Sequence, residues 1–142
     1  MKEKKMISKV KWVLGLTIAA CALTGCESNE TLEESVNARW QGIVENEYEK
    51  AYQYYSPGYK EIESLDGFKV RMSTAKLNME WHKGTYQSET CATEDACEVS
   101  VEVVYSYKFS KRSLGGVENI PTKLKENWIK VDGKWFHVPK NK

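Results

Sequence analysis

Residues 127–139 read Asn127-Trp-Ile-Lys-Val-Asp-Gly-Lys-Trp-Phe-His-Val-Pro139 and give the clearest evidence for a β-sheet. Two runs rich in β-branched and aromatic residues flank Asp132-Gly133, a pair that is typical of a two-residue hairpin turn in this setting. The turn would place Val131 opposite Lys134 and Trp128 opposite His137. Its apolar side would consist of Ile129, Val131 and Phe136, and its mixed side of Trp128, Lys130, Trp135 and His137. We expect Lys130 to stack on Trp135 in a cation–π contact.

Alternating residues predict further strands before this hairpin. A strand is expected over 98–109, where one face is apolar and the other is polar except for Val104. An earlier strand would follow Ala75, with a bulge or bend permitted at Gly84. A third strand is expected over 122–131, after a loop over 110–121. The second half of the chain therefore predicts an antiparallel sheet.

A single long helix is predicted over 31–55. Thr31 and Glu34 form a capping-box pattern at its start, and apolar residues then recur at steps of three and four as far as Tyr55. Ser56-Pro57-Gly58 would end it. A short helix is expected over 59–65, and another would follow Asp66 as its cap. One long helix, short helices and then strands predict an α+β fold.

The chain has 142 residues, which is enough for one domain of ordinary size. It contains 21 Lys and Arg and 20 Asp and Glu, but residues 1–25 hold five of the lysines and a single glutamate. The remaining residues, 26–142, therefore carry a net charge of −3. We do not expect this mildly acidic domain to bind nucleic acid, because nucleic-acid phosphates require a basic protein surface.

The first residues have the pattern of an export signal. A lysine-rich start is followed by twelve uncharged residues, Trp12–Leu23, which is short of the about 20 apolar residues that span a bilayer. The run ends in Leu23-Thr24-Gly25-Cys26, which resembles the lipobox of bacterial lipoproteins. An ordinary secretory signal or a short membrane anchor is the alternative.

The lipobox resemblance implies three parts. Residues 1–25 would be a signal peptide that is cleaved off, residues 26–30 a lipidated cysteine (Cys26) with a short polar tether, and residues 31–142 one α+β domain. Because Glu27 rather than aspartate follows the cysteine, the resemblance implies anchoring in the outer membrane, with the domain in the periplasm. In a Gram-positive cell the same signal would imply the outer face of the single membrane.

Cys91 and Cys97 remain after the leader, and an even pair in an exported protein predicts a disulfide. They bracket a short polar loop between two predicted strands, which the bond would tie together. A metal site would need more ligands, and His82 and His137 are the only histidines. We expect neither a metal nor a cofactor.

The order of these elements resembles the nuclear transport factor 2-like superfamily, which includes ketosteroid isomerases and polyketide cyclases; a cystatin-like fold is the nearest competitor. The resemblance rests on the helix 31–55, its exit Tyr54-Tyr-Ser-Pro-Gly-Tyr59 and the closing hairpin over 127–139. It implies a cone-shaped domain with a cavity between helix and curved sheet. The residues implied to line the cavity are Trp40, Val44, Tyr48, Tyr52, Tyr55, Met79, Trp81, Tyr105 and Tyr107. The alternative is that these side chains simply fill the core.

The sequence offers few residues in patterns that are typical of a catalytic site. An isomerase site would need a buried aspartate base, but Asp66, Asp95 and Asp132 all fall at a predicted helix start, loop or turn. His82 or His137 could act as a general base on its strand. The cluster of Tyr54, Tyr55 and Tyr59 could bind a partner or simply cap the helix end.

The sequence therefore predicts a lipid-anchored, non-enzymatic module that binds a small apolar ligand or a protein partner. One alternative is a lyase or isomerase acting on a hydrophobic small molecule. Another is an immunity or envelope-maintenance protein that docks through an exposed face of Trp128, Trp135 and His137. A homodimer is also compatible with the sequence.

Overall fold

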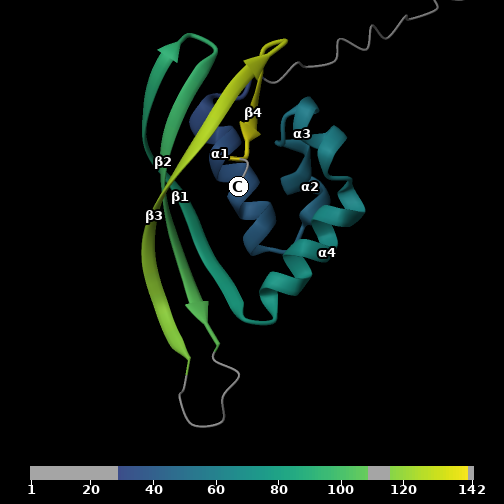
Figure 1. Cartoon of the computed structure of the whole chain (residues 1–142). Coiled ribbons are helices and arrows are strands. Elements are labelled where there is room, and N and C mark those ends of the chain that lie inside the picture. Colours follow the sequence, from purple (N-terminus) through teal and green to yellow (C-terminus); the bar gives the residue numbers. More distant parts are fainter. Residues whose placement is uncertain (1–28, 109–115, 141–142) are drawn as a thin grey trace, which may run out of the picture.

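The computed structural model describes residues 29–108 and 116–140 (Figure 1). Cys26 and the predicted signal peptide lie outside these residues. Within them, no helix has the length and apolar character needed to cross a membrane.

The described chain is an α+β fold of four helices followed by four strands. The helices are α1 (Leu32–Val44), α2 (Tyr48–Gln53), α3 (Pro57–Ile62) and α4 (Leu65–Lys76). The strands are β1 (Met79–Thr93), β2 (Ala96–Tyr107), β3 (Val117–Val131) and β4 (Lys134–Val138). They form one antiparallel sheet in the order β1-β2-β3-β4, which curves around α1 (Figure 1).

The single long helix predicted over 31–55 is wrong. The capping box at Thr31 and Glu34 is present, but α1 ends at Val44 and Asn46 takes a positive φ of 61°. The chain then turns back, so that α2 packs on α1. A Cβ at Gly42 would lie 2.9 Å from the backbone nitrogen of Ala51, which shows how closely the two helices approach.

The short helices differ from the prediction in their caps. Ser56 caps α3 through its hydroxyl, with Pro57 in the first turn, so this segment starts a helix as well as ending the preceding one. Ser64, rather than Asp66, caps α4 by accepting a hydrogen bond from Gly67.

The closing hairpin has the predicted register. Val131 pairs with Lys134 and Trp128 with His137, and both turn residues take positive φ, 50° at Asp132 and 77° at Gly133, as this kind of turn requires. Lys130 Nζ lies 5.6 Å from the centroid of the Trp135 ring, so the cation–π contact is also present.

The third strand is longer than predicted, because β3 begins at Val117 rather than at residue 122. Pro121 is tolerated there because β4 pairs only with Asn127–Val131. The earlier half of β3 is therefore a sheet edge, where a residue without an N–H group leaves no ladder bond unmade.

The chain after α2 covers one edge of the sheet, and the strand β1 is irregular where it passes α1. Tyr55 forms a bridge with His137, and the backbone of Tyr54 and Ser56 bonds to His137, so the chain after α2 covers the free edge of β4. In β1 the register shifts between Trp81 and Lys83, just before Gly84. Gly84 leaves room for Trp40, since a Cβ there would lie 2.4 Å from the indole ring.

Cys91 and Cys97 form the predicted disulfide. The two residues are directly opposite each other in the β1–β2 ladder. The bond therefore ties the two strands together near their shared turn.

Candidate functional site

Four of the five residues predicted to line a cavity from the helix side belong to the hydrophobic core or pack against it: Trp40, Tyr48, Tyr52 and Tyr55. All five are buried or partly buried: Trp40, Val44, Tyr48, Tyr52 and Tyr55. Phe68 of α4 is fully buried among the tyrosines. Its ring centroid lies 5.1 Å from that of Tyr55 and 5.6 Å from that of Tyr52, so the three rings pack together.

Of the four predicted cavity residues of the sheet, Trp81 and Tyr105 pack against this core. Met79, Trp81 and Tyr105 are partly buried, and Tyr107 is exposed. Of the nine predicted cavity residues, only Tyr107 lines one of the four surface hollows considered below. Six of the nine side chains therefore belong to the hydrophobic core or pack against it.

A buried ion pair lies at the centre of this core. Arg39 of α1 donates a hydrogen bond to Glu126 of β3 at 3.0 Å, and both side chains are almost completely buried. The same carboxylate accepts hydrogen bonds from the indole N–H groups of Trp40 at 3.0 Å and Trp128 at 3.1 Å. Burial acts to lower the pKa of Arg39, but the charge of Glu126 together with the Tyr55 hydroxyl outweighs it and raises the pKa.

His137 belongs to the same cluster. Its ring packs edge-on against Tyr55, with 5.2 Å between centroids, while the Arg39 guanidinium lies 4.9 Å from the centroid of the same tyrosine ring. Burial, with a smaller contribution from the charge of Arg39, lowers the pKa of His137 to about 2. The imidazole is therefore neutral at physiological pH, and its Nδ1 has no hydrogen-bond partner among the described residues.

The predicted partner face does not lie at the surface. Trp128 is 0% exposed and His137 is buried, whereas only Trp135 is partly exposed. The mixed side of the hairpin therefore faces α1 and the core, because the sheet curves inward and the chain around Tyr55 covers β4.

The predicted tyrosine cluster divides between core and surface. Tyr55 is buried, while Tyr59 stacks on it with 5.1 Å between ring centroids. Tyr59 donates a hydrogen bond to Glu63, which also accepts from Arg71. Burial and the bond to Glu63 raise the pKa of Tyr59 to about 12. This arrangement holds α3 against α4.

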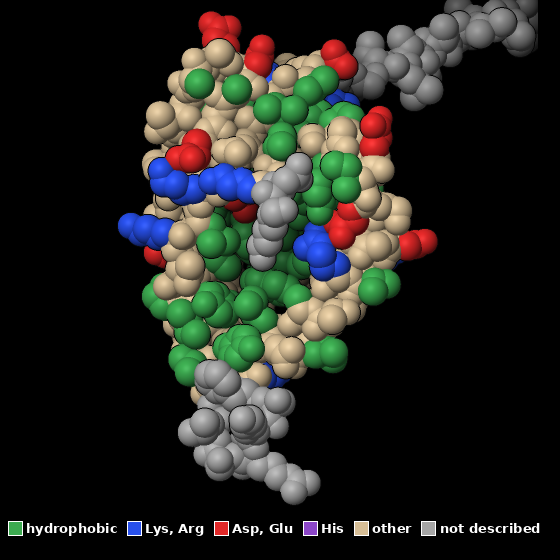
Figure 2. All heavy atoms as spheres, viewed as in Figure 1, with side chains coloured by type: hydrophobic (Ala, Val, Ile, Leu, Met, Phe, Trp, Pro, Cys, Tyr) green, Lys and Arg blue, Asp and Glu red, His purple; other side chains and the backbone are tan. Residues whose placement is uncertain are grey.

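An apolar groove lies at the surface between α3 and the outer side of the β3–β4 hairpin. Its volume is about 470 Å³. Figure 2 shows apolar side chains on both the upper and the lower half of the face turned to the viewer. The lining residues are Ser56, Pro57, Gly58, Tyr59, Ile62, Ile129, Val131, Val138 and Pro139. Ile62 is 72% exposed and Val131 36%. We call this surface the apolar groove.

A second hollow lies beside Glu30, the last residue of the segment 26–30 that the sequence predicts as a tether. It has a volume of about 210 Å³ and is lined by Glu30, Ser35, Gln53, Tyr54, Lys134, Trp135 and Phe136. Glu30 accepts a hydrogen bond from Tyr54 at 3.1 Å. Burial, followed by the charge of Glu30, raises the pKa of Tyr54 to about 12. We call this the tether-side hollow; a neighbouring hollow along α1 and α2 shares Gln53 and Tyr54 with it.

His82 is exposed, and its Nε2 lies 2.6 Å from the Ser106 hydroxyl. The pair lines a hollow of about 290 Å³ at the end of the sheet. Among residues 29–108 and 116–140, no carboxylate bonds to the other ring nitrogen of His82, and no three His, Cys, Asp or Glu side chains gather as a metal site. The pair therefore lacks the third group that orients a catalytic histidine.

Arg39 and Glu126 form the central pair of the core, but neither was among the functional residues predicted from the sequence. Arg39 lies between Val36 and Ile43 on the apolar face of α1, and Glu126 alternates with Trp128 on the inner face of β3. A charged residue on each of two apolar faces, with opposite signs, was the available signal.

Comparison with known proteins gives no assignment: no protein-family model matches the chain, and no curated protein is significantly similar to it.

Proposed function

We propose that this chain is a lipid-anchored cell-envelope protein whose nuclear transport factor 2-like domain binds an apolar segment of another envelope protein in the apolar groove. The signal pattern ending at Cys26 supports the anchor. The α+β fold, in which a curved antiparallel sheet wraps α1, is what such a domain requires. The anchoring membrane is the outer membrane of a Gram-negative cell, with the domain in the periplasm.

The apolar groove is the observation that carries this proposal. Sites for small apolar molecules enclose most of the ligand surface, but Pro57, Ile62 and Val131 on the walls of this groove are exposed. A small molecule would therefore leave much of its own surface in water. A protein segment brings a second wall with it, and burying apolar side chains such as Ile62 stabilises the complex by roughly 25 cal/mol per Å².

The packed interior also favours a binding module over a lyase or isomerase. A general base works best when its pKa is near the ambient pH, whereas the pKa of His137 is about 2. A role in immunity or envelope maintenance is compatible with the same groove, since either would need a protein partner.

Photo-crosslinking in cells tests the groove. A photoreactive amino acid in place of Ile62 is expected to give one discrete crosslinked species with an envelope protein. The matched control is Leu77, which is 74% exposed, close to the 72% of Ile62, but does not line the groove. Adding Val131→Glu to the Ile62 variant should abolish the crosslink, because it places a charge on the opposite wall.

Equal crosslinking from positions 62 and 77 would contradict the proposal. A crosslinked species of twice the chain's mass would show that the groove binds a second copy of this chain instead of a different envelope protein. Native mass spectrometry that finds a small molecule retained by the purified protein would favour the small-ligand alternative.

A further inference from the structure

The place where the tether joins the domain is fixed. Glu30 accepts hydrogen bonds from Tyr54 and Ser35, and the capping box at Thr31 starts α1 directly after it. In Figure 1, the start of α1 lies at the same upper end of the molecule as the β3–β4 turn. Lys134 and Trp135, which follow that turn, line the tether-side hollow together with Glu30.

The reach of the tether limits how far this end can be from the membrane. Glu30 is the fourth residue after Cys26, and a fully extended chain spans at most about 3.6 Å per residue, or about 14 Å in all. If Cys26 is lipidated, as the proposed function requires, its acyl chains enter the bilayer. The tether-side hollow must then lie close to the headgroups.

We infer that the tether-side hollow and the adjoining β3–β4 turn contact the phospholipid headgroups of the membrane that holds Cys26, and so orient the domain on it. This inference rests on the lipid anchor of the proposed function. It adds a second contact between protein and membrane, made by the folded domain itself.

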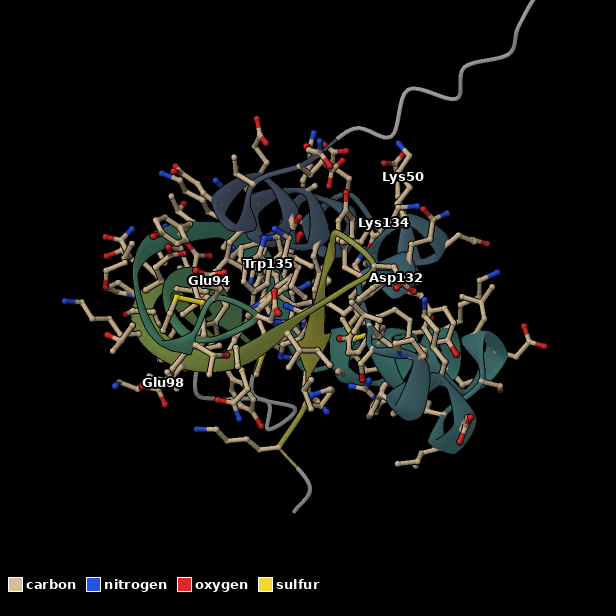
Figure 3. The ribbon with its side chains drawn as sticks, turned by 90° about the horizontal axis from the view of Figure 1, so that it is seen from above. Lys50, Glu94, Glu98, Asp132, Lys134 and Trp135 are labelled. Carbon is tan, nitrogen blue, oxygen red and sulfur yellow. A yellow bond between two sulfur atoms is a disulfide. The ribbon has the colours of Figure 1, made fainter. Side chains whose placement is uncertain are left out.

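The side chains at this end suit a headgroup layer. Lys134 is exposed and forms no ion pair with the described residues, so its ammonium group is available to a phosphate. Trp135 is partly exposed, and tryptophan prefers the interface between water and hydrocarbon. Figure 3 looks down on this end and shows Lys134 and Trp135 on opposite sides of the ribbon after the turn.

The charges favour zwitterionic over anionic lipids. Glu94 and Asp132 are exposed at the same end (Figure 3). The two hairpin turns lie together, since the backbone N–H of Lys130 donates a hydrogen bond to the carbonyl oxygen of Asp95 at 2.8 Å. Such carboxylates would repel an anionic surface. The ammonium group of phosphatidylethanolamine can approach them while its phosphate approaches Lys134.

Fluorescence quenching by lipid tests the inference. The full-length protein is produced in bacteria, purified with its anchor and reconstituted into vesicles of phosphatidylethanolamine and phosphatidylcholine brominated near the headgroup. Quenching of tryptophan emission is expected, and Trp135→Phe should remove most of it. Trp81→Phe is the matched control. Trp81 is also partly exposed, but it lies near the start of β1, at the end of the molecule opposite the β3–β4 turn (Figure 1).

A second pair of variants keeps the test open if Trp135→Phe perturbs folding. Lys134→Glu should weaken the quenching of the unaltered Trp135. Lys123→Glu, an exposed lysine without an ion pair among the described residues, should leave it unchanged.

Two results would overturn the inference. A lipidated protein whose emission is unquenched, or is quenched equally in the Trp135→Phe and Trp81→Phe variants, has its tether-side hollow turned away from the bilayer and available to a protein. If mass spectrometry finds no lipid on the purified chain, the proposed anchor itself fails, and the inference falls with it. The lipid mass distinguishes the two failures.

Discussion

The Glu126 carboxylate accepts a hydrogen bond from Arg39 at 3.0 Å in the interior of the domain, where both side chains are almost completely buried. The pair joins the first helix to the third strand across 87 residues of sequence. Two tryptophan N–H groups converge on the same carboxylate. It is therefore the point at which helix and sheet are held in register.

Glu126→Ala is expected to lower the free energy of unfolding by about 3–5 kcal/mol, because the Arg39 charge would stay buried without a counter-ion. Urea unfolding measures the change. Lys125→Ala is the matched control from the neighbouring residue: it removes an exposed pair with Glu98 and should cost less than about 1 kcal/mol. Losses of equal size would mean that the buried pair contributes no more than an exposed one.

The pH dependence of stability should report His137. Because burial lowers its pKa to about 2 in the folded protein, only the unfolded chain takes up this proton as the pH falls below about 6.5. The contribution of His137 is thus fully present above pH 6.5 and is lost progressively below it, by roughly 2 kcal/mol between pH 8 and pH 5.

His137→Gln should flatten this slope in urea titrations at several pH values, whereas His82→Gln, at an exposed strand position, should keep it. A wild-type stability that does not change between pH 8 and pH 5 would contradict a neutral, buried His137.

Gly84→Ala should destabilise the protein by about 1–3 kcal/mol through overpacking against Trp40. A Cβ at position 84 would lie 2.4 Å from the indole ring. Gly58→Ala is the control, since nothing lies within 4 Å of its Cβ position in α3, and there alanine should stabilise the helix by about 0.5–1 kcal/mol. Thermal unfolding of both variants checks the difference. The same effect at both sites would exclude close Trp40–Gly84 packing.

Replacing both Cys91 and Cys97 by serine should lower the unfolding free energy by about 2 kcal/mol, since the bond closes only a short loop. The measurement is urea unfolding with and without a reductant. A reductant should affect the wild type and leave the double variant unchanged. Insensitivity of the wild type would mean that the disulfide does not stabilise the domain.

Local signals predicted the local parts of this fold. Asp132-Gly133 set the hairpin register because a two-residue turn permits only one pairing of its strands. The Thr31–Glu34 capping box fixed the start of α1 for a similar reason. Each depends on residues that are neighbours in sequence.

The break between α1 and α2 is not visible in the apolar spacing. Tyr48 and Ala51 are buried like the apolar residues of α1, so the helical spacing continues through the turn at Asn46. Asn46 takes a left-handed backbone (φ 61°) directly after the C-cap Glu45, which ends α1. The close approach of Gly42 to Ala51 then holds α2 against α1, and the periodicity encodes neither feature.

The centre of the core was missed for a different reason. Charged residues are usually exposed, and each partner of the Arg39–Glu126 pair makes sense only once the other is beside it. The same curvature that brings them together also buried Trp128 and His137, which the hairpin pattern alone left on an open face.

The lipid anchor on Cys26 is the claim on which the proposed function and the membrane contact both depend. Cells expressing the full-length chain should incorporate labelled palmitate into it, and Cys26→Ser should abolish the incorporation. An unlabelled wild-type chain, or a Cys26→Ser chain that is still labelled, would contradict the account.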